Sequence, residues 1–343
     1  MGGRPVLFVS YSGVLGGAER VLLDCATRLG RPALLACPDG PLAEAARAAA
    51  LPVAPLREHS PRLRAAAAGA LAGFAYEVAR VVRRTRPAVV AAWSARAVLA
   101  SALLPSGPKV VAVHHDFPPS RPVAAALRGA NRRAARVIAT SGAVARSLGC
   151  AVVLAPGIDL DAWRPAPLPA PPPRALVLGA LVPWKRADLA LEIAARVPEL
   201  RLTIAGAPLD HGSPRGGAFE ARLRRRAAEP DLRGRVELAG ALDDPREAIA
   251  AAHVLLHCAD AEPWGLVLLE ALARGRKVVA PAAGGPLEIV TPDAGRLYGP
   301  GDAEAGAAAL REALAAPDPA AARRRAEAFP VEASAARFAE AIA

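Results

Sequence analysis

The stretch Glu262–Val290, EPWGLVLLEALARGRKVVAPAAGGPLEIV, decides the fold because it joins a helix start, a buried strand and a glycine pair. Apolar residues recur at helical spacing after Pro263, a residue suited to a first helical turn, so we expect a helix that begins near Gly265. The apolar run Lys277–Ala280 then predicts a buried strand. Helix followed by buried strand is the repeating unit of a parallel sheet.

The same stretch carries two glutamates and a glycine pair. Glu262 precedes the expected helix and Glu270 lies inside it, so each carboxylate can accept hydroxyl hydrogen bonds separately, one from a sugar ring and one from a ribose. The free N–H groups at the helix start favour a phosphate. Gly284 and Gly285 permit positive φ and close backbone approach to a ligand. This pattern predicts a sugar-nucleotide site, against the alternative that Glu262 is an ordinary helix-start carboxylate and Glu270 a solvated surface residue.

Composition sets the size and charge of what surrounds this stretch. The chain has 343 residues, long enough for two domains, and it is 53% hydrophobic with only 4% aromatic residues. Its net charge of +11 suggests anionic partners, or simply arginine used as the solubilising charge. No RNA-binding motif or aromatic platform accompanies the charge, so no nucleic-acid partner is expected.

The cysteines and the apolar segments bear on location. Four scattered cysteines without a C-x-x-C pair suggest neither zinc nor disulfides, and buried reduced thiols in a cytoplasmic protein are expected. The apolar run at the N-terminus turns polar at Ser10 and predicts a first strand rather than a signal peptide. The Ala-rich run Ala65–Tyr76 is too short to span a bilayer, so no transmembrane helix is expected.

Apolar runs of strand length alternate with helical patterns along the chain, which predicts an α/β fold with parallel sheets covered on both faces. The expected strands of the first half are Val6–Ser10, Ala33–Cys37, Val53–Leu56, Ala88–Ala92, Lys109–Val113, Val137–Thr140 and Ala151–Leu154. Those of the second half are Ala175–Leu178, Arg201–Ala205, Arg235–Leu238, Val254–His257 and Lys277–Ala280. Each half therefore predicts a Rossmann-like domain.

A dense proline cluster, WRPAPLPAPPPR, interrupts this alternation between Trp163 and Arg174 and is typical of an interdomain linker. We expect a first domain over residues 1–165, a linker over 166–174 and a second domain over 175–330, the two domains facing each other across a cleft. The short amphipathic segment 331–343 is expected to pack back on the first domain.

Two loops of the first domain carry suitable chemistry. Gly16 and Gly17 precede an expected helix, where backbone amides can cradle a phosphate or sugar. The fifth strand leads into His114 and His115 at the sheet edge where ligands gather. Adjacent histidines point in opposite directions on an extended chain, so a polar contact from His114, or a hydrogen-bonded strand-end histidine, is favoured over a metal site.

In the second domain, Lys185 and Arg186 stand immediately before an expected helix. Cations at a helix start oppose the helix dipole, so they are tolerable if an anion sits between them and the helix. This placement favours diphosphate binding over a plain solvated face.

Together these motifs resemble the retaining glycosyltransferases of family 4, over nearly the whole chain. The motifs occur in the order seen in that family: GGAERVLL, VHHDF, APGIDLDAW, LVPWKRADL, EPWGLVLLEALARG and GGPLE. The resemblance implies a GT-B fold, a nucleoside diphosphate sugar donor held mainly by the second domain, and no required metal or other cofactor. The implied activity is transfer of a hexose-type sugar, with retention of configuration, to a hydroxyl acceptor such as a glycan or lipid-linked glycan in polysaccharide biosynthesis.

The resemblance also implies roles for particular residues. Glu270 corresponds to the ribose-binding glutamate, and Glu262 to the glutamate that contacts the donor sugar near the reacting carbon. Lys185, joined by Arg186, corresponds to the lysine that neutralises the donor diphosphate, and His114 to the strand-end histidine near the reacting sugar and acceptor. The backbone groups implied to hold the donor are those of Gly16, Gly17, Gly265, Leu266 and Val267.

Two departures from the family pattern stand out. Many members have an arginine after the glycine that ends the first strand of the second domain, whereas Ala180 follows Gly179 here. Loss of that cation from the leaving diphosphate is costly unless Arg186 compensates, and it favours the alternative of a catalytically weak or inactive sugar-binding protein. The loop Gly206–Asp210 also lacks the usual glycine-rich turn, which leaves recognition of the base open. An oxidoreductase is disfavoured because no G-x-G-x-x-G follows the first strand.

The acceptor side is the least defined by the sequence. A helix within residues 61–86 has Leu71, Phe74, Val78 and Val81 on one face and arginines at its end. Such a helix suits either the core of the first domain or peripheral contact with an anionic membrane. A cytoplasmic location is expected, with contact at the inner face of the membrane if the second interpretation holds.

Overall fold

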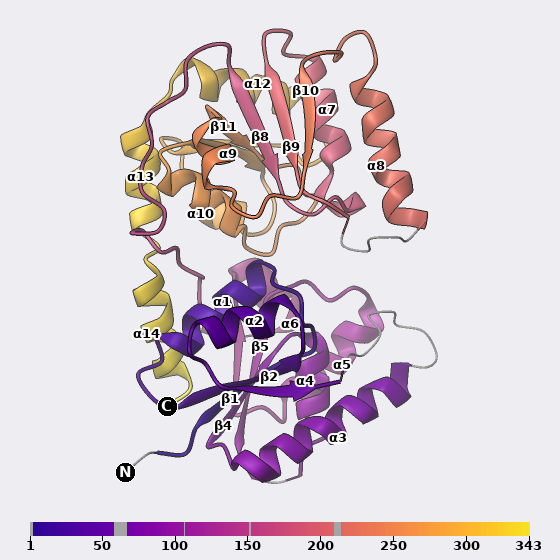
Figure 1. Ribbon diagram of the computed structural model, residues 1–343, viewed down its shortest axis with the longest axis vertical. Coiled ribbons are helices and arrows are strands. Elements are labelled where there is room, and N and C mark those ends of the chain that lie inside the picture. Colours follow the sequence, from indigo (N-terminus) through magenta and orange to yellow (C-terminus); the bar gives the residue numbers. More distant parts are fainter. Residues whose placement is uncertain (1–2, 58–66, 106, 151, 209–213) are drawn as a thin grey trace. The chain divides into compact units, whose positions relative to one another are not determined.

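The computed structural model describes residues 3–57, 67–105, 107–150, 152–208 and 214–343. It divides into two compact units, drawn in Figure 1. The first unit comprises Met1–Gly157 with Val331–Ala343, and the second comprises Ile158–Pro330. Each unit is built on one parallel sheet flanked by helices, as the alternation of apolar runs and helical patterns predicts.

The first unit contains a seven-stranded sheet with the order β3-β2-β1-β4-β5-β6-β7, in which every neighbouring pair is parallel. The central strands β1 and β4 are buried along their whole length and almost entirely apolar, because helices cover both of their faces. Its strands are β1 Val6–Ser10, β2 Ala33–Pro38, β3 Val53–Leu56, β4 Val89–Trp93, β5 Lys109–His114, β6 Arg136–Ala139 and β7 Val152–Val153.

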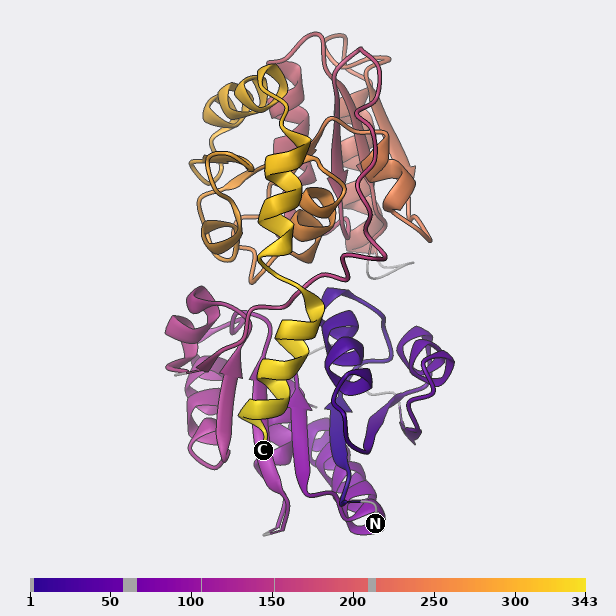
Figure 2. The ribbon, with the colours of Figure 1, turned by 90° about the vertical axis from the view of Figure 1, so that its left-hand side faces the viewer.

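Seven helices complete the described part of this unit, including the one that ends the chain. They are α1 Gly17–Thr27, α2 Pro41–Ala48, α3 Ala67–Thr85, α4 Ala95–Ser101, α5 Arg121–Asn131, α6 Gly142–Leu148 and α14 Val331–Ala341. Figure 2 shows α14 lying along the first unit. Its Phe338 ring packs 5.6 Å from those of both Phe8 and Trp93, measured between centroids, so α14 is part of the core of this unit.

Helix α3 uses its apolar face for packing within the first unit. Phe74, Val78 and Val81 are buried in the core, and Leu71 packs against it. Of the two interpretations of this helix, the structure therefore supports core packing, and the apolar face is not available to a lipid surface. Residues 61–66 of the predicted segment lie outside the described part of the chain.

The second unit contains a six-stranded parallel sheet with the order β10-β9-β8-β11-β12-β13. Its strands are β8 Arg174–Leu178, β9 Arg201–Ala205, β10 Val236–Gly240, β11 Val254–Leu256, β12 Lys277–Pro281 and β13 Gly295–Tyr298. Its helices are η1 Pro183–Lys185, α7 Ala187–Ala195, α8 Pro214–Ala227, α9 Arg246–Ala250, α10 Leu266–Ala273, α11 Pro286–Ile289, α12 Ala303–Ala315 and α13 Pro319–Glu327. Sequence reasoning missed β13, a four-residue edge strand whose pattern is too short to distinguish from a loop.

The boundary between the units falls at Gly157, earlier than the expected linker at 166–174. The proline-rich segment is held to the second unit by Arg276, whose side chain is fully buried. Its guanidinium donates hydrogen bonds to the carbonyl oxygens of Ala166, at 2.8 Å, and Pro167, at 2.5 Å. An extended segment that is bound to a domain and a free linker have the same composition. Only the long-range contacts with Arg276 show that this proline-rich segment is bound to the second unit.

No helix in the described residues is both long enough and apolar enough to cross a membrane.

Candidate donor site and its partners

The helix predicted within Glu262–Val290 is α10, which begins at Leu266, one residue after Gly265. Gly265 adopts a φ of 102°, a conformation that favours glycine, and lets the chain turn sharply from Glu262 into the helix. The first N–H groups of α10, those of Leu266 and Val267, have no acceptor within the helix. Both residues are partly exposed, so this helix end can meet an anion.

The glycine pair after β12 supports this turn. Gly284 forms a parallel bridge with Glu262, and the N–H of Gly285 donates a 2.8 Å hydrogen bond to the Glu262 carbonyl oxygen. A Cβ on Gly284 would overlap that oxygen, and one on Gly285 would overlap the carbonyl oxygen of Trp264. The close approach that these glycines permit is thus to the protein's own backbone, where the sequence had suggested approach to a ligand.

Glu262 is the centre of a buried charged cluster. Its carboxylate Oε2 forms an ion pair with Lys185 Nζ and lies 3.1 Å from Nε2 of His257. The side chains of Glu262 and His257 are only 10% and 6% exposed, and that of Lys185 is 23% exposed. The alternative that Glu262 is an ordinary helix-start carboxylate does not account for this arrangement.

The surroundings keep the Glu262 carboxylate ionised. Burial alone raises the pKa of a carboxyl group, but the close contacts with the His257 imidazole and the Lys185 ammonium group outweigh burial and lower the Glu262 pKa to about 2. Glu262 is therefore an anion throughout the neutral range. It suits stabilisation of positive charge or acceptance of hydroxyl hydrogen bonds rather than proton donation.

Glu270 lies about one turn into α10, which begins at Leu266, and is only 7% exposed. The alternative of a solvated surface residue is wrong, because the helix is buried around it by neighbours such as Leu269 and Ala271. Carboxylates are rarely buried to this extent, so the burial of Glu270 sets it apart from an ordinary helix residue.

Lys185 ends the short helix η1, and Arg186 follows it with a φ of 54° as the N-cap of α7. The predicted position of both cations before a helix is therefore confirmed. Arg186 donates a 2.8 Å hydrogen bond from Nη1 to Asp260 and a longer one, at 3.3 Å, from Nε to Asp188. Its charge is thus already balanced by protein carboxylates, which weakens the expectation that it replaces the arginine absent at Ala180.

The backbones that follow strands β8 and β9 lie in close contact at one edge of the sheet. Gly179 follows β8 and Gly206 follows β9, and a Cβ on Gly206 would overlap the carbonyl oxygen of Gly179. This contact fixes where the loop after β8, which begins with Gly179 and Ala180, and the loop after β9, which begins with Gly206, leave the sheet. Residues 209–210 of the loop considered for base recognition lie outside the described residues.

In the first unit, Gly16 and Gly17 begin α1 as predicted, with Gly16 as the N-cap. The N–H of Gly16 donates a 3.1 Å hydrogen bond to Oε2 of Glu19, the half of a capping box that a glycine N-cap can form. Trp93 fixes the same turn by donating a 3.0 Å hydrogen bond from Nε1 to the carbonyl oxygen of Ala18. One amide of the predicted phosphate-binding loop is thus already used by the helix cap.

His114 ends β5 and is 2% exposed, with Nε2 at 2.9 Å from Oδ1 of Asn131. Burial lowers the pKa of His114, and the hydrogen bond with Asn131 only partly opposes that effect. Several nearby polar atoms are buried without a hydrogen-bond partner in the described structure: Nδ2 of Asn131, Oγ1 of Thr140 and Nε2 of His115. Unpaired buried donors of this kind are typical of a place where a ligand supplies the missing partner.

The structure adds residues that sequence reasoning did not select. His257 belongs to the cluster around Glu262, and Asp260 pairs with Arg186. Asn131 and Thr140 accompany His114. His257 directly follows β11 at the sheet edge where ligands gather, so its position was a usable signal. Asn131 ends α5 and carries no such signal. Within the described residues, no group of three or more His, Cys, Asp or Glu side chains is arranged to hold a metal ion.

Comparison with solved structures defines the class of this fold. The Anabaena protein HepE in complex with UDP-glucose aligns over 98% of both chains with a TM-score of 0.84 and 22% identity. Sucrose-phosphate synthase from Thermosynechococcus elongatus aligns over 98% of both chains with a TM-score of 0.84 and 20% identity. The two Rossmann-like units are those of the GT-B glycosyltransferase fold.

Sequence comparison then gives the family. The profile described as Glycosyltransferase Family 4 matches residues 15–162, and the profile described as Glycosyl transferases group 1 matches residues 161–329. The chain belongs to glycosyltransferase family 4. It is 35% identical over 182 residues to D-inositol 3-phosphate glycosyltransferase of Mycolicibacterium paratuberculosis, a match over 49% of this chain and 40% of the relative. The chain thus spans well under half the length of the curated relatives it matches.

Proposed function

We propose that this protein transfers a hexose-type sugar from a nucleoside diphosphate sugar to a hydroxyl acceptor, with retention of anomeric configuration. The observation that carries the proposal is the buried cluster of Glu262, Lys185 and His257 immediately before the start of α10. In this proposal a sugar diphosphate is bound by a carboxylate in contact with a cation, next to the free N–H groups of a helix start.

In the proposed reaction, the bond between the anomeric carbon and the diphosphate oxygen breaks and its electron pair leaves with the phosphate. The acceptor oxygen forms the new bond on the same face, and its proton passes to the departing diphosphate. In the transition state, negative charge builds on the leaving phosphate and positive charge builds on the sugar ring. In this proposal Lys185 and the N–H groups of Leu266 and Val267 stabilise the negative charge, and Glu262 stabilises the positive charge.

Lys185 has a partner to exchange in this mechanism. Its ammonium group contacts Glu262, and it also lies 4.4 Å from the centroid of the Trp184 ring. A donor diphosphate would attract Lys185 from Glu262, and the carboxylate oxygen so released would accept a hydrogen bond from a donor sugar hydroxyl. Glu270, which is buried within α10, is proposed to accept hydrogen bonds from the ribose hydroxyls. Arg186 and Gly265 complete the donor-binding set.

The acceptor is proposed to bind beside His114. The neutral imidazole and the unpaired polar atoms of Asn131 and Thr140 offer hydrogen bonds to acceptor hydroxyls. Gly16 and Gly17 are proposed to contact the donor phosphates from the first unit. In this proposal the reaction requires no metal ion or other cofactor.

One relative supports a glycan or lipid-linked glycan as the acceptor class, whereas others are named for D-inositol 3-phosphate. This relative is the lipopolysaccharide core biosynthesis glycosyltransferase LpsE of Rhizobium meliloti, 31% identical over 148 residues, a match over 43% of this chain and 41% of LpsE. We propose a role of this kind in polysaccharide biosynthesis, at a cytoplasmic location. Any contact with the inner face of the membrane would involve the polar surface of α3, because its apolar face is buried.

A second candidate function is a sugar-nucleotide or glycan-binding protein with little turnover. It is favoured by Ala180, which leaves the diphosphate without the arginine that many family members have, while Arg186 is paired with Asp260. Sustained turnover of a bound donor in the presence of acceptor would exclude it.

A thermal-shift screen of UDP, GDP and ADP with their sugars tests the donor proposal, followed by turnover assays with glycan acceptors. We expect stabilisation by one nucleotide series and its loss in Glu270→Ala. The Glu247→Ala variant, changed on the surface of the same unit, serves as control and should bind as the parent does. Equal binding by Glu270→Ala and the parent would refute the ribose assignment. The anomeric configuration of the product, read by NMR, decides between retention and inversion.

A further inference from the structure

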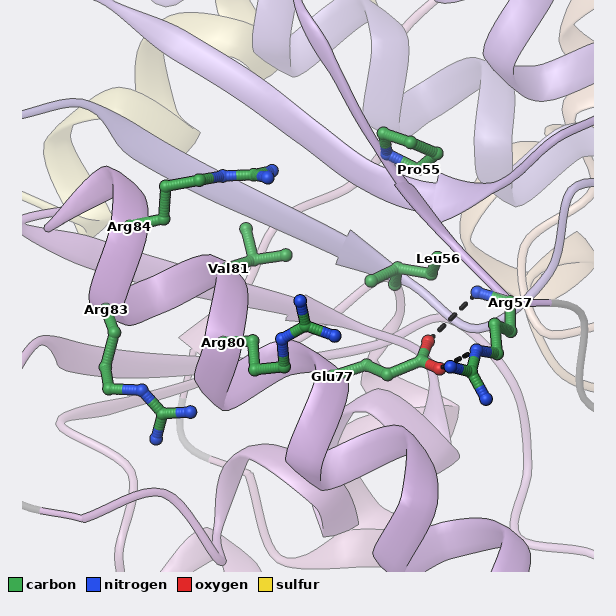
Figure 3. Close-up of a pocket in the computed structure, with 8 residues that line it drawn as sticks. All are labelled: Pro55, Leu56, Arg57, Glu77, Arg80, Val81, Arg83 and Arg84. Carbon is green, nitrogen blue, oxygen red and sulfur yellow. Dashed lines mark hydrogen bonds and ion pairs between the residues drawn. The ribbon is translucent and has the colours of Figure 1, made fainter.

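A second basic site lies in the first unit, away from the residues assigned to donor and acceptor. Strand β3 and helix α3 enclose an open pocket of about 630 Å³, shown in Figure 3. Its lining consists of Pro55, Leu56, Arg57, Glu77, Arg80, Val81, Arg83 and Arg84. Four arginines face one glutamate, so the pocket has a strong positive charge. A space of this size holds a phosphate together with part of the molecule that bears it.

One arginine of the pocket is held in place by the protein. Glu77, whose side chain is 14% exposed, accepts a 2.9 Å hydrogen bond from the backbone N–H of Arg57 and pairs with the Arg57 guanidinium at 3.3 Å. Figure 3 shows both contacts. The single carboxylate of the lining is therefore already engaged with Arg57 and is not left to neutralise the arginines on the helix.

Among the residues that the structure describes, the arginines of α3 have no carboxylate partner of this kind. Arg80, Arg83 and Arg84 make no ion pair with any carboxylate in the described part of the chain, whereas Arg226, Arg186 and Arg47 each have one. Arg80 and Arg84 lie one helical turn apart and repel each other. The negative end of the α3 dipole stabilises Arg83 and Arg84, which lie in the last turn of the helix. Arg57 follows β3 and is not stabilised in this way. An anion bound among them would relieve this repulsion.

The shape of the pocket also restricts what can occupy it. Strand β3 is at the edge of the sheet, but Pro55 has no N–H, so an added strand could not pair fully there. The floor contributed by Leu56 and Val81 is small and apolar, and Figure 3 shows the Arg80 guanidinium directed toward Leu56. Arg83 extends away from Leu56, at the rim. Arginine forks around a concave surface match the geometry of phosphate oxygens.

We propose that this pocket binds a phosphate-bearing group, with Arg57, Arg80 and Arg84 as its principal ligands. The group is either the headgroup of an anionic phospholipid or the phosphate of a soluble metabolite, because the same arginine chemistry recognises both. The site is independent of the proposed sugar-nucleotide site, which draws on other residues.

The test uses pyrophosphate titrations by calorimetry, with every protein carrying Lys185→Ala so that the proposed donor site contributes little. We expect Arg80→Gln/Arg84→Gln to weaken pyrophosphate binding by about tenfold or more, since each charge-assisted contact is lost. The control Arg222→Gln/Arg225→Gln removes the same charge from the exposed surface of helix α8 and should bind as the parent does. Arg80→Lys/Arg84→Lys, which keeps the charge but loses the forks, should fall between.

Co-sedimentation with vesicles of phosphatidylglycerol and phosphatidylcholine separates the two sources of phosphate. Vesicle binding that requires Arg80 and Arg84 and is displaced by pyrophosphate supports a lipid headgroup. Pyrophosphate binding without vesicle binding supports a soluble ligand. Absence of binding to both probes, or an equal loss in the control pair, would overturn the proposal. Unchanged melting temperatures establish that the variants are folded.

Discussion

Replacing Glu262 with glutamine is expected to destabilise the second unit by about 3 kcal/mol at pH 7. The substitution keeps the shape of the side chain but removes the charge that Lys185 and His257 share. Those contacts lower the Glu262 pKa from its ordinary value of 4.5 to about 2, against the opposing effect of burial. At about 1.4 kcal/mol for each pH unit between the two values, the folded protein gains roughly 3 kcal/mol from the ionised carboxylate.

The pH dependence of this loss provides a second check. Because the folded pKa lies below the unfolded one, the stability from Glu262 is present above pH 4.5 and is lost as the pH falls toward about 2. The difference between parent and Glu262→Gln should therefore shrink from about 3 kcal/mol at pH 7 to roughly 1.4 kcal/mol at pH 3.

Urea unfolding followed by tryptophan fluorescence measures the difference in this unit. Trp163, Trp184 and Trp264, three of the four tryptophans, lie in the second unit. Glu247→Gln is the matched control, because Glu247 pairs with Arg274 while 89% exposed and should change stability by less than about 0.5 kcal/mol. A Glu262→Gln protein as stable as that control, or a difference that does not change with pH, would refute the reasoning.

Three further outcomes are expected. Gly285→Ala should destabilise the protein by about 1–3 kcal/mol in the same urea assay, because the new Cβ would overlap the carbonyl oxygen of Trp264. Gly217→Ala, in a helix with open space around it, should be neutral or stabilising, and similar effects from the two variants would contradict the packing argument. His114→Ala should lower kcat by about tenfold or more with the donor KM nearly unchanged, and because burial lowers the His114 pKa, any acid limb due to this residue should lie below pH 6.5; a limb above that value would exclude the assignment. Treatment with EDTA followed by gel filtration should leave turnover unchanged, and loss of activity restored by a divalent ion would show that the proposed reaction needs a metal.

Local sequence patterns predicted most of the secondary structure because buried parallel strands are continuous apolar runs. Strands such as Val6–Ser10 and Arg201–Ala205 have the expected bounds, and helix α10 begins one residue from the expected position. The failures are elements whose sequence lacks such a run. The short edge strand Gly295–Tyr298 is one, and the proline-rich chain held by Arg276 is another.

The sequence by itself determined the two-unit α/β architecture, the family, and the placement of Glu262, Glu270 and Lys185 around helix starts. These features follow from periodicity and motif order, which are local properties of the chain. Only the tertiary structure decided that Glu262 and Lys185 are paired across 77 positions and that the glycine pair supports a backbone turn. Such contacts depend on which strand ends lie side by side, and the order of strands in a sheet is not encoded in any single stretch.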